Sequence, residues 1–155
     1  MTAAGTDRIE RSIHLKAPRS RVWRALTDAT EFGRWFGVDL SGSPKAEAGA
    51  TLRGPITSEG WRHVIFEAVV DAAEPETRYA LRWHPYAVEP GVDYSHEPTT
   101  LIVFTLEDDA AGGTLLTVVE SGFDAIPAAR RAKAFQMNAS GWTAQMQSIE
   151  RHLGA

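Results

Sequence analysis

Hydrophobic and polar residues alternate along much of the chain with a period of two. In residues 9–17 the apolar side chains fall mostly at every second position, with polar or charged side chains between them. This pattern is typical of a β-strand that is buried on one face. Four later runs have the same character and cover residues 61–71, 78–83, 99–106 and 114–121. Gly-rich or acidic turns separate them, and together the runs predict an antiparallel meander.

Two short helices are predicted directly after the first strand. Pro18 suits the first position of a helix, and the apolar residues after it recur at helical spacing. Asp28 and Glu31 have the spacing of a capping box, which predicts a second helix that ends at Gly37. Shorter strands are expected near residues 38–40 and 51–53, where glycines and prolines break the pattern.

The C-terminal segment changes to the helical period. Its apolar residues recur at spacings of four and three, namely Ala128, Ala132, Phe135, Ala139, Trp142, Met146, Ile149 and Leu153. At about 3.6 residues per turn they predict one amphipathic helix of about seven turns that packs against the sheet. Gly141 interrupts this helix. We expect it to mark either a packing contact with a bulky sheet residue or the close approach of backbone or ligand.

Length and composition narrow the class of protein. The 155 residues are enough for one domain, which we place at residues 8–155 after a disordered N-terminus of residues 1–7. The sequence has neither a secretion signal nor an apolar stretch of membrane-spanning length, so a cytoplasmic protein is expected. A net charge of −4 argues against binding to nucleic acid. The absence of cysteine excludes disulfides, thiolate nucleophiles and iron–sulfur clusters, and no cofactor is predicted.

Five tryptophans are more than the packing of a chain of this length needs. We assign Trp23 to the core and expect the other four to line a cavity for an apolar or aromatic molecule. The predicted ligand-facing side chains are Trp35, Trp61, Trp83, Phe123, Trp142 and Met146, with Asn138 and Gln145 as groups that orient a ligand by hydrogen bonding. The alternative for each of them is an ordinary place in the core or on the solvated surface.

The connection of residues 84–98 is long and contains three prolines. Connections of this length without structure of their own are uncommon and often cover a site, so a lid over the cavity is predicted. The side chains of this predicted lid are His84, Tyr86, Asp93, Tyr94, His96 and Glu97. Their spacing matches no recurrent metal motif, and no metal site is predicted. An inert, rigid loop is the alternative.

Glu120 is the strongest candidate for acid–base chemistry. It follows an apolar run in which alternation places it on the same face as Leu116 and Val118. If that face borders the cavity, burial raises the pKa of Glu120, and Glu120 and His84 could serve as the acid and base of a cyclase or hydrolase. If the face points outward, Glu120 is an ordinary surface residue.

Three segments of the sequence carry a family resemblance. They are residues 17–37 (APRSRVWRALTDATEFGRWFG), residues 114–123 (TLLTVVESGF) and the pair Gly141 and Trp142. Together with the order of the predicted elements, they resemble the family of activators of the heat-shock-protein-90 ATPase, within the START-like (SRPBCC) superfamily. The resemblance implies an α+β helix-grip fold, as in the birch-pollen allergen, in which a curved antiparallel sheet wraps around a long C-terminal helix.

The resemblance implies more than one function, because this architecture serves many roles. Our main hypothesis is non-enzymatic binding of a small hydrophobic or aromatic ligand. A cyclase or hydrolase and a co-chaperone-like interaction module, with the stress response as its setting, are the alternatives. The eukaryotic co-chaperone has an additional N-terminal domain that we do not expect in 155 residues. A homodimer is a further option, because residues 101–106 and 115–119 are apolar on both faces.

Overall fold

The computed structural model describes residues 7–85 and 92–154, to which all structural statements refer. Six strands form one antiparallel sheet in the order β1-β6-β5-β4-β3-β2. The strands are β1 (Arg8–Leu15), β2 (Thr51–Pro55), β3 (Ile65–Glu74), β4 (Arg78–Trp83), β5 (Thr100–Asp108) and β6 (Thr114–Ser121). The helices are α2 (Arg19–Thr27), α3 (Ala29–Phe36), the 3-10 helix η1 (Phe123–Ala125) and α4 (Ala128–His152).

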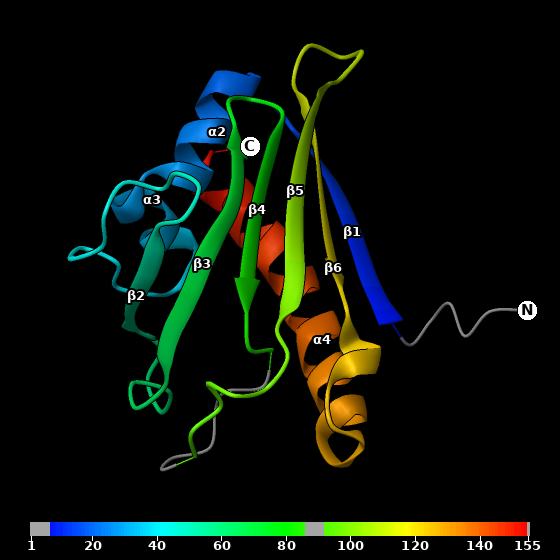
Figure 1. Ribbon diagram of the computed structural model, residues 1–155. Helices are drawn as coiled ribbons and strands as arrows, with labels where there is room; N and C mark the ends of the chain where they lie inside the picture. The colour runs from blue at the N-terminus through cyan, green and yellow to red at the C-terminus, as the bar shows by residue number, and fades with distance from the viewer. Residues whose placement is uncertain (1–6, 86–91, 155) are drawn as a thin grey trace, which may run out of the picture.

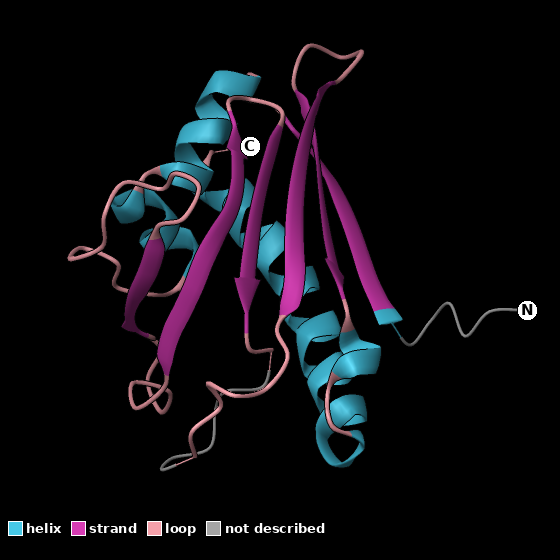
Figure 2. Cartoon of the chain, in the orientation of Figure 1, coloured by secondary structure: helices cyan, strands magenta, loops and turns pink. Residues whose placement is uncertain are grey.

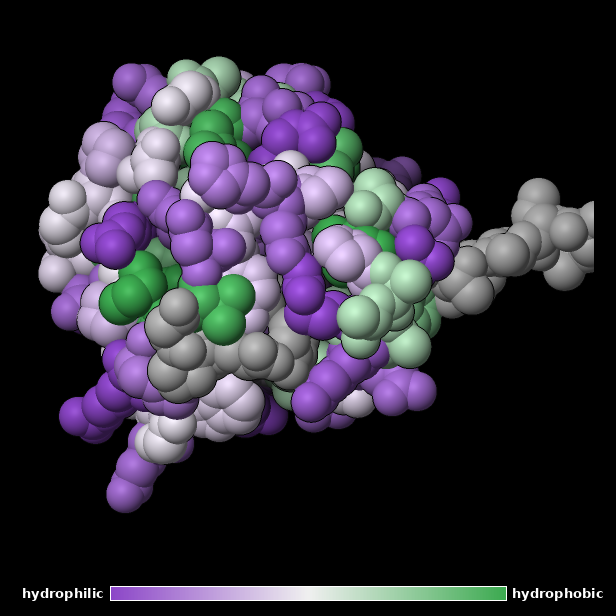
Figure 3. Space-filling model, turned by 60° about the horizontal axis from the view of Figure 1, so that its bottom comes forward, coloured by the Kyte–Doolittle hydropathy of each residue, from purple (hydrophilic) through white to green (hydrophobic). Residues whose placement is uncertain are grey.

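The molecule has two layers, with the sheet on one side and the helices on the other (Figures 1 and 2). Helix α4 crosses one face of the sheet diagonally, and α2 and α3 lie near its C-terminal end. The end at which α4 begins comes forward in Figure 3 and carries apolar side chains among polar ones. The predicted α+β helix-grip fold is confirmed. None of the described helices has the length and apolar character of a membrane span.

Two strand predictions differ from the structure for local reasons. Strand β3 begins at Ile65, four residues later than expected. The backbone N of Trp61 donates to Ser58 O, and Gly60 has a φ of 85°, so this stretch is a turn. Of residues 38–40, only Val38 pairs with the sheet, through an isolated bridge to Ile56, the residue that follows β2. The chain turns after Val38 because the Asp39 side chain accepts from the backbone N of Ser41.

The buried stripe of α4 is rotated from the predicted one in its first half. Ala128 and Ala132 were predicted to face the core but are exposed, and Ala134 and Asn138 are buried instead. Hydrophobic spacing missed Asn138 because a polar side chain counts against burial in such a pattern. The buried Asn138 amide has a buried hydrogen-bond partner on the sheet, the carboxylate of Glu120.

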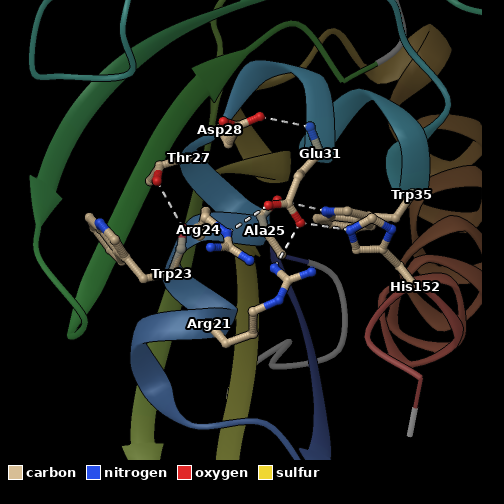
Figure 4. Close-up of polar contacts among 9 residues, drawn as sticks. All are labelled: Arg21, Trp23, Arg24, Ala25, Thr27, Asp28, Glu31, Trp35 and His152. Carbon is tan, nitrogen blue, oxygen red and sulfur yellow. Dashed lines mark hydrogen bonds and ion pairs between the residues drawn. The ribbon is translucent and has the colours of Figure 1, made fainter.

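The second helix begins as predicted, but only half of the capping box forms. Asp28 Oδ1 accepts from the backbone N of Glu31 at 2.9 Å. The backbone N of Asp28 already donates to Arg24 O at the end of α2, so the Glu31 carboxylate turns elsewhere. It accepts from Arg21 at 2.7 Å and Arg24 at 2.8 Å, and it bonds His152 of α4 at 2.9 Å (Figure 4). Glu31 thus joins three helices.

We expect Glu31→Gln to lower the free energy of unfolding in a pH-dependent way. Burial alone would raise the pKa of Glu31, but hydrogen bonds from His152, Arg21 and Arg24 outweigh it and lower the pKa to about 2. This stabilisation is therefore present above pH 4.5, the ordinary value, and is lost as the pH falls toward 2. Because Arg24 is exposed and solvent screens the cluster, we expect a loss of about 1–2 kcal/mol at pH 7.

Urea unfolding of the wild type and Glu31→Gln from pH 7 to pH 2.5 measures this effect. The exposed Glu59→Gln is the matched control, with an expected change below about 0.5 kcal/mol. A difference between wild type and Glu31→Gln that stays constant down to pH 2.5 would contradict the prediction.

Candidate functional site

A cavity of about 820 Å³ lies between the first residues of β3, the end of β4, the last residue of α3 and the middle of α4. From these elements it is lined by Ile65, Phe66, Glu67, Trp83, Phe36, Met137, Asn138, Gly141, Trp142, Ala144 and Gln145. The segments before β3 and after β4 add Ile56, Ser58, Trp61, His63, Val64, His84, Pro85, Val92, Asp93, Tyr94 and Ser95. Its volume is in the range of small-molecule sites.

Aromatic rings form the inner wall of this cavity. Phe36 contacts Phe66, Trp83 and Trp142 edge-on, with ring centroids 5.4, 6.2 and 6.1 Å apart. Trp83 and Trp142 lie 6.2 Å apart. These rings come from α3, β3, β4 and α4, so only the folded chain brings them together. At the outer end of the cavity, Trp61 is 46% exposed, which shows that the cavity opens to solvent there.

Behind this wall the carboxylate of Glu120 is fully buried. Its Oε2 accepts from Trp83 Nε1 at 2.7 Å and Thr100 Oγ1 at 2.5 Å. Its Oε1 accepts from Trp142 Nε1 at 2.8 Å and Asn138 Nδ2 at 3.0 Å. Four donors from β4, β5 and α4 thus meet one side chain of β6. This cluster joins the sheet to the long helix and determines the orientation of both indoles.

Burial raises the pKa of Glu120, while the hydrogen bonds from Thr100, Trp83, Trp142 and Asn138 act in the opposite direction. The sequence alone does not determine whether Glu120 is buried, and the structure shows that it is. However, Glu120 is not among the described residues that line the cavity, whereas His84 is. A general acid or base must reach the substrate proton. Enclosed by four donors, Glu120 has the geometry of a structural carboxylate.

The segment after β4 is tied to the start of α4. Glu97 pairs with Arg130 of α4, and the Arg130 guanidinium lies 5.7 Å from the centre of the Tyr94 ring. His84 Nε2 lies 3.0 Å from Glu97 O, which anchors the two ends of the connection to each other. These contacts fix the described part of the connection in position, and its residues 92–95 form part of the cavity wall.

The residues proposed as lid side chains divide into three groups. His84, Asp93 and Tyr94 line the cavity, whereas His96 and Glu97 do not. Tyr86 lies outside the described residues. Among the described residues, no cluster of histidine and carboxylate side chains has the arrangement of a metal site.

The structure brings together five of the eight predicted ligand-facing residues, which are Trp61, Trp83, Asn138, Trp142 and Gln145. The other three lie in the core. Trp35 is 4% exposed and donates to Ala25 O at 2.8 Å, so its indole packs between α2 and α3. Phe123 is fully buried against Phe135, and Met146 is buried next to the lining residue Gln145 without lining the cavity itself.

Phe36, Phe66 and Met137 also line the cavity and were not predicted from the sequence. Phe36 lies in the second predicted helix, far along the chain from the other rings of the wall, so local spacing carried no signal of their contact. Gly141 was expected to mark a packing contact or the approach of a ligand. A Cβ atom built at Gly141 would meet no atom within 4 Å, so the packing explanation is wrong and the glycine borders open space.

Comparisons with known proteins agree with this architecture. The protein NE0264 from Nitrosomonas europaea superposes with a TM-score of 0.73 at 17% identity, covering 99% of this chain and 97% of that one. The Aha1 dimer from Colwellia psychrerythraea gives 0.66 at 18% identity, with coverages of 94% and 95%. No curated protein matches the sequence at a significant level.

A third similar structure is DynU16, a protein of the dynemicin biosynthetic locus. It has a TM-score of 0.69 at 27% identity, covering 96% of this chain. The chain spans about half the length of DynU16, 48%. A family model described as Activator of Hsp90 ATPase homolog 1-like protein matches residues 16–154. Because that match covers most of the sequence, the chain belongs to the family of Activator of Hsp90 ATPase homolog 1-like proteins.

Proposed function

We propose that the protein binds a small apolar or aromatic molecule in the cavity between the sheet and α4, without catalysing a reaction on it. The observation that carries this proposal is the aromatic wall. Trp83 and Trp142 line the cavity, yet both direct their N–H groups to Glu120 behind it. Their ring carbons therefore remain for contact with a guest, which is how aromatic side chains contribute most to binding.

The exposed apolar side chains support the same proposal. Trp61, Ile65 and Val92 are 46%, 39% and 46% exposed, and all three line the cavity. Apolar residues that stay exposed in a folded chain often mark a binding site. Because these exposed apolar side chains all lie along this one cavity, their arrangement supports a small-molecule site more than a broad docking surface for a chaperone. In this proposal residues 92–95 act as a lid over the guest.

A small-molecule role is also in keeping with the likeness to DynU16, which belongs to a biosynthetic locus. The cyclase or hydrolase alternative has weaker support, because Glu120 is enclosed while His84 borders the cavity. Contact with a chaperone, a role in the stress response, a cytoplasmic location and a homodimer stay predictions.

Titration with N-phenyl-1-naphthylamine, a neutral aromatic dye, tests the proposal. We expect its fluorescence to rise on binding, and to fall again when flavonoids or other apolar aromatic compounds displace it. The intrinsic tryptophan fluorescence should change over the same concentrations, because Trp83 and Trp142 border the guest. A folded protein that gives neither signal at micromolar to millimolar dye would overturn the proposal.

A further inference from the structure

Apart from the two histidines His63 and His84, the ionisable acids and bases among the described residues of the cavity wall are carboxylic acids and one tyrosine, Tyr94. Among the described lining residues there are two carboxylates, Glu67 and Asp93, and no lysine or arginine. Glu67 has a partner outside the wall, because its Oε2 lies 3.9 Å from Arg53 Nε. A guest that carries a carboxylate would lose its water without gaining a lysine or arginine partner from the described wall, which is unfavourable.

Asp93 is the lining carboxylate whose ionised form is stabilised by hydrogen bonds. Its Oδ1 accepts from the backbone N of Ser95 at 2.9 Å. Hydrogen bonds from Ser95 lower the pKa of Asp93 below its ordinary value. The side chain is therefore negatively charged at neutral pH and stands at the solvent-facing part of the cavity wall.

Two amide side chains on α4 have orientations that their partners determine. Asn138 Nδ2 donates to the Glu120 carboxylate at 3.0 Å, and Gln145 Nε2 donates to Phe36 O at 2.9 Å. Both partners are acceptors, so the amide nitrogen must face them in each case. The carbonyl oxygens of both amides remain as acceptors on residues that line the cavity.

The indole N–H groups of the aromatic wall are not available to an anionic guest. Trp83 and Trp142 both donate to the Glu120 carboxylate behind the wall, so neither offers this donor to a molecule in the cavity. The lining therefore presents carboxylates and amide oxygens to a positively charged guest, and neither of these two indole N–H groups to a negatively charged one.

We infer that the cavity selects aromatic molecules that carry an ammonium group and disfavours aromatic carboxylates. This inference rests on the proposed function and names the class of ligand for the same site. The aromatic part of the guest contacts Phe36, Trp83 and Trp142, and the ammonium group lies toward Asp93.

Three naphthalenes with one ring system and different charges provide the test. They are 2-naphthylmethylamine, 2-naphthylmethanol and 2-naphthoate, each measured by displacement of N-phenyl-1-naphthylamine. We expect the amine to bind at least tenfold more tightly than the carboxylate, with the alcohol between them. The advantage of the amine should shrink as the salt concentration rises.

Asp93→Asn removes the charge but keeps the oxygen that accepts from Ser95. It should weaken amine binding about two- to fivefold, the range of an exposed ion pair, and leave the alcohol unchanged. Asp39→Asn is the matched control, because Asp39 Oδ1 accepts from the backbone N of Ser41 in the same kind of turn and does not line this cavity. It should change the binding of none of the three.

The outcomes separate the two proposals. If the dye itself fails to bind the folded protein, the proposed function fails. If the dye binds but the three naphthalenes displace it equally, or the carboxylate displaces it best, or none displaces it, the ammonium selectivity is wrong and the binding site stands. Equal effects of Asp93→Asn and Asp39→Asn on amine binding would also overturn the role of Asp93.

Discussion

Replacing Glu120 by glutamine is expected to lower the free energy of unfolding by about 2–4 kcal/mol, although the two side chains have nearly the same shape. Each carboxylate oxygen accepts from one indole, Trp83 on one side and Trp142 on the other. A glutamine must place its NH₂ group on one of these sides. An indole N–H can only donate, so either orientation sets two donors against each other.

The second donor on each side does not resolve this conflict. Thr100 can turn its hydroxyl to accept from the new amide, but the neighbouring Trp83 cannot. On the other side, both Trp142 and Asn138 donate. A protonated glutamate escapes the conflict, because its hydroxyl oxygen can donate to Thr100 and still accept from Trp83. Glutamine is therefore a poor substitute for either protonation state.

The pH dependence of this effect follows from the direction of the pKa shift. Burial raises the pKa of Glu120 above 4.5, so the folded chain holds this proton more tightly than the unfolded chain does. The corresponding stabilisation is complete below pH 4.5 and is lost as the pH rises through the folded-state pKa. We therefore expect the gap between wild type and Glu120→Gln to be widest near pH 4.5 and to narrow toward pH 8.

Urea unfolding at pH 4.5, 6 and 8 measures this gap. The exposed Glu107→Gln on β5 is the matched control, with an expected change within about 0.5 kcal/mol. If Glu120→Gln is as stable as the wild type across this range, the four donors do not depend on the carboxylate and the structural role assigned to Glu120 is wrong.

Replacing Gly141 by tryptophan is expected to weaken binding of the neutral dye at least tenfold while the chain stays folded. Gly141 lines the cavity, and a Cβ atom there would meet nothing within 4 Å. A large side chain at this position extends into the space that the guest would occupy. The helix itself tolerates the change, because glycine is the less favourable residue within a helix.

Two further variants separate blocked binding from a general effect. Gly141→Ala should leave dye binding nearly intact and raise the free energy of unfolding by up to about 1 kcal/mol. Ser140→Trp places the same indole at an exposed neighbouring position of α4 and should not affect binding. Circular dichroism and urea unfolding confirm that each variant is folded. Unchanged dye affinity in Gly141→Trp would show that the guest binds elsewhere.

The two expected results concern two different parts of the same site, the support behind the aromatic wall and the open space in front of it. Glu120 lies behind the aromatic wall and holds Trp83 and Trp142 in place, whereas Gly141 leaves space in front of it. Loss of stability with Glu120→Gln and loss of binding alone with Gly141→Trp would therefore separate the support of the cavity from the cavity itself.

Local periodicity predicted most of the elements because it reports which face of an element is buried. The period of two located the strands of the meander, and the spacing of four and three located α4 to within a residue or two of its ends. The predictions that were wrong depended on turns or on polar burial. Trp61 lies in a turn with Gly60, and the buried Asn138 does not fit an apolar stripe.

The sequence by itself determined the order of the elements, the family resemblance and the supply of aromatic residues. It also singled out Glu120, Asn138 and Trp142, but as separate candidates with open alternatives. Only the tertiary structure decided that these three side chains and Trp83 form one cluster, and that Trp35 and Phe123 belong to the core. The physical reason is that hydrogen bonds and cavities form between residues that are distant along the chain, where local spacing carries no information.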